Sequence, residues 1–519
     1  MSKRAHAPVR SGDVVEVTID RLAQGGRGVA RHEGFVLFVG RALPGDRVKA
    51  RVTRVKRSFA EGVVDSLVEP GERTTPPQCD PKGECGACSW QRLPYDEQLR
   101  LKADLVRDAI IRIGGVDEPP MDDIVGADDP SHYRNKVEYT FAQDPETGEI
   151  TSGYHKAGAW DEIIAVDQCL IADPRGTAAK RVVDAWANQH SLAVYDRESG
   201  AGLLRSMVIR VGWHTGEVQV HVVTGPTKHG LPKGAELADD LEAAVDGLVG
   251  VLHSETDSPA EVSFGAEPPK LLWGRDWFEE VLGGHRLRVR SQSFLQTNTA
   301  MADKLYERVI AVAEPRPDDV AYDLYCGLGS ITLAIAPHVE EVVGVEVVDE
   351  AIECAKENAE LNGITNVEWQ VGNVRPILKF AKGVWPDPSL IVVDPPRAGL
   401  APKVVRRICE AGPERIVYVS CNPTTFAGNL PMFREHGYQL TYVQPVDQFP
   451  YTPHCELIAR FEPIPGFEPP AEEDIVFGRN KRDKGRRPQG EDGARDVQAE
   501  GADGAAAPDP VVGSGEPEG

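Results

Sequence analysis

The sequence predicts an α/β protein built on a doubly wound, mostly parallel sheet, with an OB-like β-barrel at the N-terminus and an α+β domain between them. Three observations predict this arrangement. Strand-like apolar runs alternate with helical patterns from residue 318 onward. Short strand-like runs separated by glycine turns fill residues 12–68, the pattern of a small five-stranded barrel. Residues 131–285 mix both kinds of element.

Size and composition are those of a water-soluble protein with several domains. The 519 residues suffice for three domains, and a hydrophobic content of 41% is ordinary. No run approaches the ~18 apolar residues of a membrane span, and no apolar segment follows Lys3 and Arg4. We therefore expect a cytoplasmic protein. The nine cysteines, an odd number, suit thiols or metal ligands better than a disulfide framework.

The N-terminal barrel is basic, although the whole chain has a net charge of −24. Residues 1–60 hold thirteen Lys and Arg against five Asp and Glu. A basic module on an acidic body can bind a polyanion locally, and OB-type barrels commonly bind oligonucleotides. The alternative is that these cations only solvate a small barrel.

A cysteine-rich loop follows the barrel. The stretch "CDPKGECGAC" spaces Cys79, Cys85 and Cys88 as C-x5-C-x2-C, on a loop rich in Gly and Pro. Three thiols this close can share one centre, and a fourth ligand would complete a zinc site or an iron–sulfur cluster. Cys169, in "VDQCLIA", is the distant candidate for that ligand. The spacing predicts a metal site without choosing the metal. After this loop, helical spacing of apolar residues predicts a helix over 95–113.

The C-terminal sheet has five candidate strands with helices between them. The helix after the second strand begins with Asp349 as its expected N-cap and ends before Gly363. Such sheets bind ligands at the carboxyl ends of their strands. The candidate strands are residues 320–325, 342–348, 367–371, 390–394 and 415–420.

A glycine loop at that edge predicts a nucleoside ligand. In "DLYCGLG", Gly327 and Gly329 let the backbone approach a ligand closely, but the third glycine of a dinucleotide fingerprint is absent. Glu346 ends the next strand, where a carboxylate can accept hydrogen bonds from ribose hydroxyls. S-adenosylmethionine fits this pattern best; NAD and a purely structural loop are the alternatives. Asp394, in "DPPRAGL", lies at the same edge, where a merely rigid turn is the alternative.

Two further residues at this edge could carry chemistry. Cys421, in "SCNPTTF", follows an apolar strand and could be an inert buried thiol, a metal ligand or a nucleophile. Glu456, in "HCELIARF", enters an apolar strand and is either paired structurally or poised as a base with a raised pKa.

Together these motifs resemble the uracil-5 RNA methyltransferases, which form 5-methyluridine in ribosomal and transfer RNA. The resemblance spans about residues 9–462 and includes "GRGVAR", "LPGDRV", "FLQTN", "DLYCGLGS", "VGVE", "DPPRAG", "SCNP" and "FPYTPHCE". It implies a TRAM-type RNA-binding barrel at 9–70 and a central domain at 71–285 with the iron–sulfur loop. A Rossmann-like methyltransferase domain at 286–462 and a disordered tail at 463–519 complete the expected order.

The resemblance also implies roles for individual residues. Cys421 would be the nucleophile that adds to C6 of uracil, and Glu456 the base that removes the C5 proton. Ser330 departs from the family, where Asn is frequent. The residues expected in the S-adenosylmethionine pocket are Gln296, Tyr325, Ser330, Glu346, Asn373 and Asp394. Those expected to hold a 4Fe-4S cluster are Cys79, Cys85, Cys88 and Cys169.

The expected function is methyl transfer from S-adenosylmethionine to C5 of a uridine in RNA. The barrel and cysteine loop favour 23S ribosomal RNA; uridine 54 of transfer RNA and a non-catalytic RNA-binding role are the alternatives. We expect a monomer that binds RNA and no membrane. A methyltransferase acting on a small molecule fits the basic barrel poorly. The residues expected to form an RNA face are Tyr133, Arg134, Lys136, Tyr139, Phe141, Tyr154, His155 and Lys156.

Overall fold

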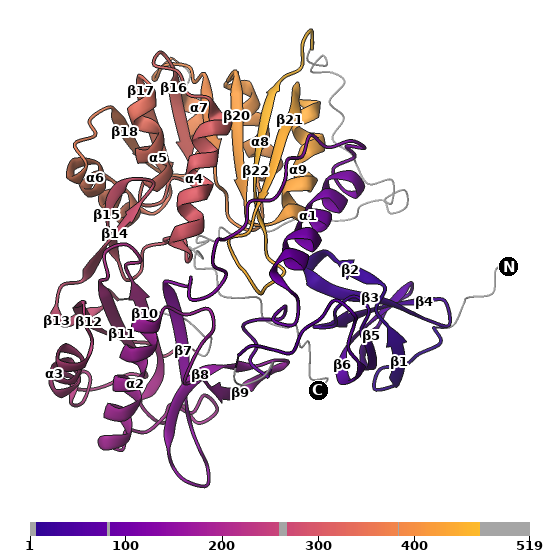
Figure 1. Ribbon diagram of the computed structural model, residues 1–519. Helices are drawn as coiled ribbons and strands as arrows, with labels where there is room; N and C mark the ends of the chain where they lie inside the picture. The colour runs from indigo at the N-terminus through magenta and orange to yellow at the C-terminus, as the bar shows by residue number, and fades with distance from the viewer. Residues whose placement is uncertain (1–6, 80–83, 259–266, 382, 468–519) are drawn as a thin grey trace, which may run out of the picture.

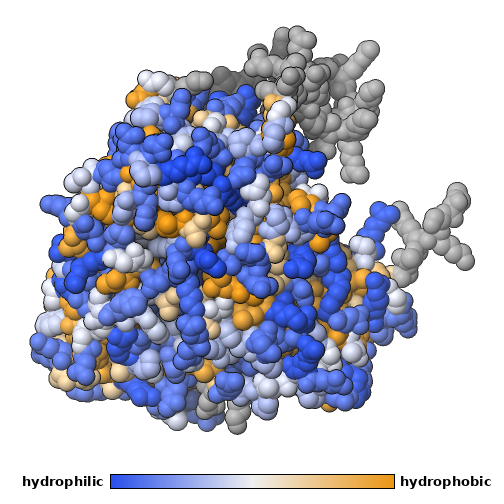
Figure 2. All heavy atoms as spheres, turned by 45° about the horizontal axis from the view of Figure 1, so that its top comes forward, coloured by the Kyte–Doolittle hydropathy of each residue, from blue (hydrophilic) through white to orange (hydrophobic). Residues whose placement is uncertain are grey.

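The computed structural model describes residues 7–79, 84–258, 267–381 and 383–467. In these ranges three large sheets and one two-stranded sheet follow one another along the chain, and Figure 1 shows the first two large sheets side by side beneath the third. None of the helices in these ranges is long and apolar enough to cross a bilayer. On the face drawn in Figure 2, hydrophobic residues form small patches scattered among hydrophilic ones.

The N-terminal sheet has six strands in the order β1-β5-β6-β4-β3-β2, where the sequence predicted five. The additional strand, β2, is only three residues long, too short for alternation of apolar and polar residues to reveal it. Inward-facing residues of the N-terminal sheet, such as Val39, Val48 and Ala60, are fully buried in the core of this domain. The strands are β1 (Val14–Thr18), β2 (Arg21–Ala23), β3 (Arg27–His32), β4 (Phe35–Gly40), β5 (Arg47–Val55) and β6 (Phe59–Glu69).

Helix α1 (Tyr95–Arg112) lies between the barrel and the C-terminal sheet, as predicted for 95–113 (Figure 1). It packs on β2 at one end and on α9 (Pro423–Glu435) along its length. Apolar residues at helical spacing, including Val106 and Ile110, are fully buried against the C-terminal domain. The helix therefore contacts both the N-terminal barrel and the C-terminal domain.

The central domain is a seven-stranded sheet in the order β13-β12-β11-β10-β7-β8-β9, with helices α2 (Pro174–Gln189) and α3 (Gly234–Ala244) packed on it. Pairing is antiparallel except between β11 and β12. The strands are β7 (Lys136–Gln143), β8 (Ile150–Lys156), β9 (Ala159–Ala165), β10 (Leu204–Val211), β11 (Val218–Thr224), β12 (Leu248–Glu255) and β13 (Lys270–Gly274).

The predicted aromatic RNA face of this domain is wrong in part. Tyr133, Tyr139 and Phe141 are buried in the core with Trp186 of α2, so they offer no ring for base stacking. Tyr154 packs on the same core. Successive side chains of a strand point to opposite faces, and the sequence did not reveal which face the helices cover.

The hairpin of β14 (Trp277–Leu282) and β15 (His285–Arg290) leads to α4 (Thr299–Ala313) and the C-terminal sheet. That sheet has the order β18-β17-β16-β19-β20-β22-β21, parallel up to β20 and antiparallel from β22, which confirms the predicted doubly wound, mostly parallel arrangement. Its strands are β16 (Val320–Leu324), β17 (Glu341–Glu346), β18 (Val367–Val371), β19 (Leu390–Val393), β20 (Arg415–Ser420), β21 (Tyr438–Val446) and β22 (Glu456–Pro463).

For four of the five predicted strands, the C-terminal end agrees with the observed C-terminal end to within one residue. Helix α6 (Asp349–Leu361) also forms as predicted and ends before Gly363, which has a positive φ. Val348, rather than Asp349, is its N-cap; the Asp349 carboxylate lies in the first turn, where it favours the helix dipole instead of capping a backbone N–H. The other helices are α5 (Ser330–Ile335), α7 (Val374–Ala381) and α8 (Pro402–Glu410).

The predicted disordered tail, 463–519, lies mostly outside the described residues. Its first residues pack on the domain: the N–H of Ile464 donates to the Gly437 carbonyl at 2.7 Å, and the ring of Phe467 lies over Gly437.

Candidate active site

A pocket opens at the carboxyl edge of the C-terminal sheet, where β16 and β19 end. Its walls come from residues 294–296, from Tyr306 on α4, from the loop after β16 and from Asp394 after β19. Gln296, Tyr325, Ser330 and Asp394, all predicted pocket residues, line it. The tertiary structure therefore brings four of the six together around one cavity.

The glycine loop makes the floor of this pocket. Tyr325, Gly327 and Gly329 have φ values of 68°, 55° and 86°, in the left-handed region. Gly329 has no room for a side chain, because a Cβ there would lie 2.8 Å from the Trp369 ring. Tyr325 is a bulky residue in a conformation that costs about 1–3 kcal/mol, a strain that concentrates at functional sites. The turn therefore holds its backbone open to a ligand.

Glu346, at the end of β17, contacts the glycine loop but does not line the pocket. Its Oε2 accepts a hydrogen bond from the N–H of Gly327 at 3.2 Å. Its Oε1 accepts from the N–H groups of Val347 and Val348 at 2.7 and 3.0 Å. These three donors fix the carboxylate beside the glycine loop, where the sequence predicted a ribose-binding acid.

Two aspartates place negative charge at the pocket. Asp323, on β16, is 1% exposed; its Oδ2 accepts from the Thr332 hydroxyl at 2.5 Å, and its Oδ1 has no hydrogen-bond partner among the described residues. Burial raises the pKa of Asp323 to about 7. Burial, followed by the charge of Asp323, also raises the pKa of Asp394 to about 7. Sequence reasoning missed Asp323, although it opens the quoted "DLYCGLG". Buried carboxylates with an unused oxygen suit a cationic ligand.

Gln296 and Ser330 are held by neighbouring side chains. Gln296 is buried, and its Oε1 lies 3.4 Å from the Nε2 of Gln448. The hydroxyl of Ser330 lies 2.8 Å from that of Tyr306. Ser330 thus still presents a polar group on the pocket wall despite its departure from Asn. Asn373 is exposed just after β18 and is not among the lining residues, so its role stays a prediction.

Cys421 and Glu456 lie opposite one another beside the pocket. Strands β20 and β22 pair antiparallel, with Ser420 opposite Leu457. The next position along this register places Cys421 opposite Glu456, and facing residues of an antiparallel pair extend to the same side. Cys421 is half-buried, and Glu456 is 3% exposed.

Burial is the largest cause of the raised pKa values of both Cys421 and Glu456. It raises the pKa of Glu456 to about 8, with a smaller contribution from Asp394. It raises the pKa of Cys421 to about 12, helped by the charges of Glu456 and Asp394. A glutamate with such a pKa is a stronger base than an ordinary carboxylate. The thiol needs a nearby positive charge to ionise.

Arg397 supplies one such charge and was missed as a functional residue, although it stands in the quoted "DPPRAGL". Its charge lowers the pKa of both Cys421 and Glu456 against the effect of burial. The start of α9 holds its backbone: Asn422 Nδ2 and the Thr425 hydroxyl donate to the Arg397 carbonyl at 3.2 and 3.1 Å.

Comparison with known proteins agrees with this geometry. Residues 262–372 and 387–459 match the family described as tRNA (uracil-5-)-methyltransferase, and residues 8–64 match the TRAM domain. An uncharacterized RNA methyltransferase of Halalkalibacterium halodurans is 36% identical over 464 residues, covering 89% of this chain and 99% of the relative. One from Caldanaerobacter subterraneus is 36% identical over 459 residues, covering 87% and 99%. The chain belongs to this RNA methyltransferase family.

Among solved structures, the Pyrococcus abyssi tRNA (uracil-54, C5)-methyltransferase with bound S-adenosyl-L-homocysteine resembles the chain with a TM-score of 0.69. It is 28% identical, and the match covers 86% of this chain and all of that one. The protein is thus an S-adenosylmethionine-dependent RNA (uracil-5-)-methyltransferase with an N-terminal TRAM domain.

The four predicted metal-binding cysteines of this methyltransferase are neighbours, but they do not form a coordination group. All four are free thiols, and Cys85, Cys88 and Cys169 are buried. Burial raises the pKa of Cys85 to about 11, and the charges of Cys169 and Cys79 add to it. Within the described residues, however, no three His, Cys, Asp or Glu side chains are placed to hold a metal ion. Residues 80–83 of the loop lie outside that part of the chain.

Arg41 connects the TRAM barrel of the methyltransferase to this cysteine loop. Its guanidinium donates to the carbonyls of Cys85, Gly86 and Cys88 at 3.0, 3.3 and 3.3 Å. The loop also pairs with β8 of the central domain, since the N–H of Gly86 donates to the His155 carbonyl at 2.8 Å. The cysteine loop is therefore a junction between two domains.

Phe294 is a third residue that sequence reasoning missed. It stands in the quoted "FLQTN", lines the pocket, and yet is 70% exposed. A flat aromatic ring at the mouth of a pocket and open to water is available for stacking.

Proposed function

We propose that this methyltransferase methylates C5 of one specific uridine in structured RNA through a covalent adduct between Cys421 and C6. The observation that carries the proposal is that Cys421 and Glu456 stand one step beyond the last pair of β20 and β22, Ser420 and Leu457, and that the charge of the pocket-lining Asp394 acts on both. C5 of uracil is a poor nucleophile, and addition of a thiolate to C6 makes it an enolate carbon that can take up a methyl group.

Each residue of the site has one task in this reaction. The sulfur of Cys421 forms a bond to C6, which increases the electron density at C5. When bound, S-adenosylmethionine supplies the methyl group and a positive sulfonium charge. A positive charge close to Asp323, Asp394 and Glu456 lowers the pKa values of these three carboxyl groups, which burial has raised. The same charge lowers the raised pKa of the Cys421 thiol.

Glu456 completes the reaction. Its carboxylate takes the proton from C5, the electrons of that C–H bond restore the C5–C6 double bond, and the bond from C6 to the sulfur of Cys421 breaks. General base catalysis of this kind contributes ~10²–10⁴-fold. We further propose that Gln296, Tyr325, Ser330, Glu346, Asn373 and Asp394 bind S-adenosylmethionine, which the pocket and its carboxylates support.

RNA that carries 5-fluorouridine tests the mechanism, because fluorine cannot leave C5 as a proton. Wild-type protein with S-adenosylmethionine should form an adduct that survives denaturing electrophoresis. Cys421→Ala should abolish it, whereas Cys409→Ala, which removes a buried thiol on α8 away from the pocket, should not. Absence of an adduct with folded, cofactor-binding wild type would eliminate the covalent mechanism and leave RNA binding without catalysis.

The RNA target is the finer part of the proposal. The TRAM barrel together with a cysteine loop favours 23S ribosomal RNA. Uridine 54 of transfer RNA is a second candidate, favoured by the likeness to the Pyrococcus abyssi enzyme. Mass spectrometry of both RNA classes from a deletion strain should show 5-methyluridine lost from one position of one class.

We also propose that Cys79, Cys85, Cys88 and Cys169 hold a 4Fe-4S cluster. A set of four neighbouring free thiols, with carbonyls of the same loop bound by Arg41, supports the assignment. Anaerobically purified protein should contain about four iron and four sulfide per chain, and Cys85→Ser should lose both. Stoichiometric zinc without iron would contradict the cluster. Domain limits at residues 70, 285 and 462, cytoplasmic location and a monomeric state stay predictions.

A further inference from the structure

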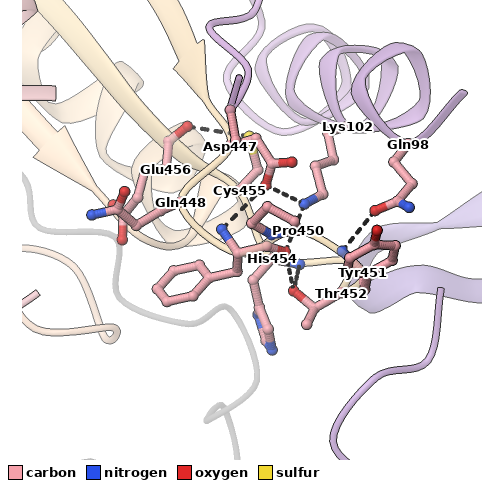
Figure 3. A network of polar contacts seen from close by, with 12 residues as sticks. Gln98, Lys102, Asp447, Gln448, Pro450, Tyr451, Thr452, His454, Cys455 and Glu456 are labelled. Atoms are coloured by element: carbon pink, nitrogen blue, oxygen red, sulfur yellow. Dashed lines mark hydrogen bonds and ion pairs between the residues drawn. The ribbon is translucent and has the colours of Figure 1, made fainter. Parts of the chain in front are cut away.

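Residues 447–455, here called the base loop, connect β21 to β22 and end directly at Glu456 (Figure 3). The loop leaves the C-terminal sheet and descends beside the lower end of α1, as Figure 1 shows. The carboxylate of Glu456 is only partly held by side chains: its Oε2 is buried without a hydrogen-bond partner in the described chain. The position of this base therefore depends on the backbone that carries it.

The base loop is held from outside by a buried ion pair. Lys102, on α1, pairs with the Oδ1 of Asp447, and both side chains have zero exposure. The same ammonium donates to the Phe449 carbonyl at 2.9 Å. Asp447 Oδ1 also accepts from the N–H of Phe449 at 3.1 Å, so one cation fixes the first turn of the loop.

Other domains hold the middle of the base loop. Gln98, one turn before Lys102 on α1, accepts from the N–H of Tyr451 at 2.7 Å, and the N–H of Trp90 donates to the Tyr451 carbonyl at 2.9 Å. The Tyr133 hydroxyl donates to the Pro450 carbonyl at 3.1 Å. Tyr451 has a φ of 65°, a strained conformation for a non-glycine residue. External contacts therefore maintain a loop shape that its own sequence disfavours.

The C-terminal end of the base loop transmits this shape to Glu456. Cys455 is buried, and its thiol lies 3.6 Å from the Val446 carbonyl and 3.2 Å from the Glu456 carbonyl. Val446 and Glu456 are themselves paired where β21 and β22 meet the loop. Both ends of the base loop are thus adjacent, so a displaced first turn displaces the base.

An ion pair at zero exposure is a costly way to stabilise a fold. Desolvation of two charges offsets most of their attraction, and apolar replacements of buried pairs are often as stable. We propose that Lys102 is a positioning residue for the second half of the reaction: it holds the base loop so that Glu456 meets the C5 proton. This inference rests on the proposed covalent mechanism.

The two halves of the reaction separate this role from a structural one. In the first half the thiolate of Cys421 adds to C6 and the C5–C6 π electrons form an enolate. C5 then takes the methyl group as the bond from that methyl to the sulfonium sulfur breaks, which leaves neutral S-adenosylhomocysteine. In the second half the C5–H electrons re-form the double bond, the proton goes to Glu456 and the sulfur leaves. Loss of Lys102 should slow the second half at least about tenfold, within the ~10²–10⁴-fold that a positioned base contributes, and leave the first half nearly unchanged.

The variants are Lys102→Met and the double variant Lys102→Met/Asp447→Asn, each in the full-length protein. The double variant leaves no unpaired buried charge, so it guards against simple unfolding. Lys180→Met/Asp184→Asn is the matched control, because this ion pair within α2 is also largely buried but does not touch the base loop. Single-turnover reactions with methyl-labelled S-adenosylmethionine and unmodified RNA measure methyl transfer and adduct release separately.

Both Lys102 variants should bind S-adenosylmethionine normally, transfer the methyl group, and accumulate a methylated RNA–protein adduct, as Glu456→Gln should. The Lys180 variant should release its adduct at the wild-type rate. Release at the wild-type rate by the double variant, or equal slowing of both halves, would overturn the positioning role. The wild-type reaction with 5-fluorouridine RNA separates a failure of the positioning role from a failure of the covalent mechanism. If wild type forms the adduct, an overturned result concerns the role of Lys102 alone. If wild type forms no adduct, the covalent mechanism is wrong as well.

Discussion

Cys421 and Glu456 come from strands that run in opposite directions and lie at facing positions one step beyond the last pair, Ser420 and Leu457. This register places a sulfur and a carboxylate on the same side of the sheet, beside the pocket. The mechanism proposed above needs a thiolate at C6 and a carboxylate at C5 of one uracil ring, and these two residues are the pair that we propose for it.

The release of product should depend on the protonation of Glu456. Its pKa is raised to about 8, and only the carboxylate accepts the C5 proton. Adduct release should therefore increase with pH and level off above 8, falling about tenfold for each pH unit below the pKa. Single-turnover release between pH 6 and 9 measures it, with methyl transfer in the same samples as the reference. A flat profile would contradict the role of Glu456 as base.

Removal of the Arg397 charge should shift the first half of the reaction to higher pH. This cation lowers the pKa of Cys421 and of Glu456, so in Arg397→Ala both groups hold their protons more tightly. Adduct formation at pH 7.5 should slow, its pH profile should move upward, and Arg397→Lys should recover part of the loss. If alanine reduces the rate equally at every pH, Arg397 contributes contacts and not charge.

Binding of S-adenosylmethionine should strengthen with pH, whereas binding of S-adenosylhomocysteine, which lacks the sulfonium charge, should change less. Asp323 and Asp394 have pKa values raised to about 7, so below that pH they are largely neutral and attract a cation weakly. Between pH 6 and 8 the ratio of the two affinities should rise several-fold, about 1 kcal/mol for one added charge. Calorimetric titration measures both ligands, and Asp394→Asn should flatten the difference.

Truncation of the Phe294 side chain should reduce the catalytic efficiency of the enzyme with its RNA substrate. Its ring is 70% exposed at the pocket mouth, where an extruded base can stack on it. Stacking contributes about 1–3 kcal/mol per base, so Phe294→Ala should reduce kcat/KM for RNA roughly 5- to 150-fold. Phe294→Tyr keeps a flat ring and should lose little. A tyrosine variant as weak as alanine would mean that stacking is not the role of this side chain.

Patterns local in the chain determined much of this protein. Alternating strands and helices predicted the doubly wound sheet, and Tyr325, Asp394 and Cys421 follow the ends of its parallel strands at one edge, as such a pattern requires. Glu456 lies at the same edge because its strand, β22, is antiparallel and begins there. The resemblance of several short motifs then implied their chemistry. The metal-site cysteines, predicted from spacing, are neighbours without a coordination group in the described residues.

Only the tertiary structure decided which face of each strand is buried and which residues distant in the sequence come into contact. Tyr139 and Phe141 alternate along β7 as an RNA face would, but helix packing places them in the core. Lys102 and Asp447 are 345 positions apart, and no local pattern marks either as a partner of the other. Strand and helix periods depend on neighbours along the chain, whereas the contacts that hold the base loop depend on how separate domains dock, and that is determined by the packing of the whole molecule.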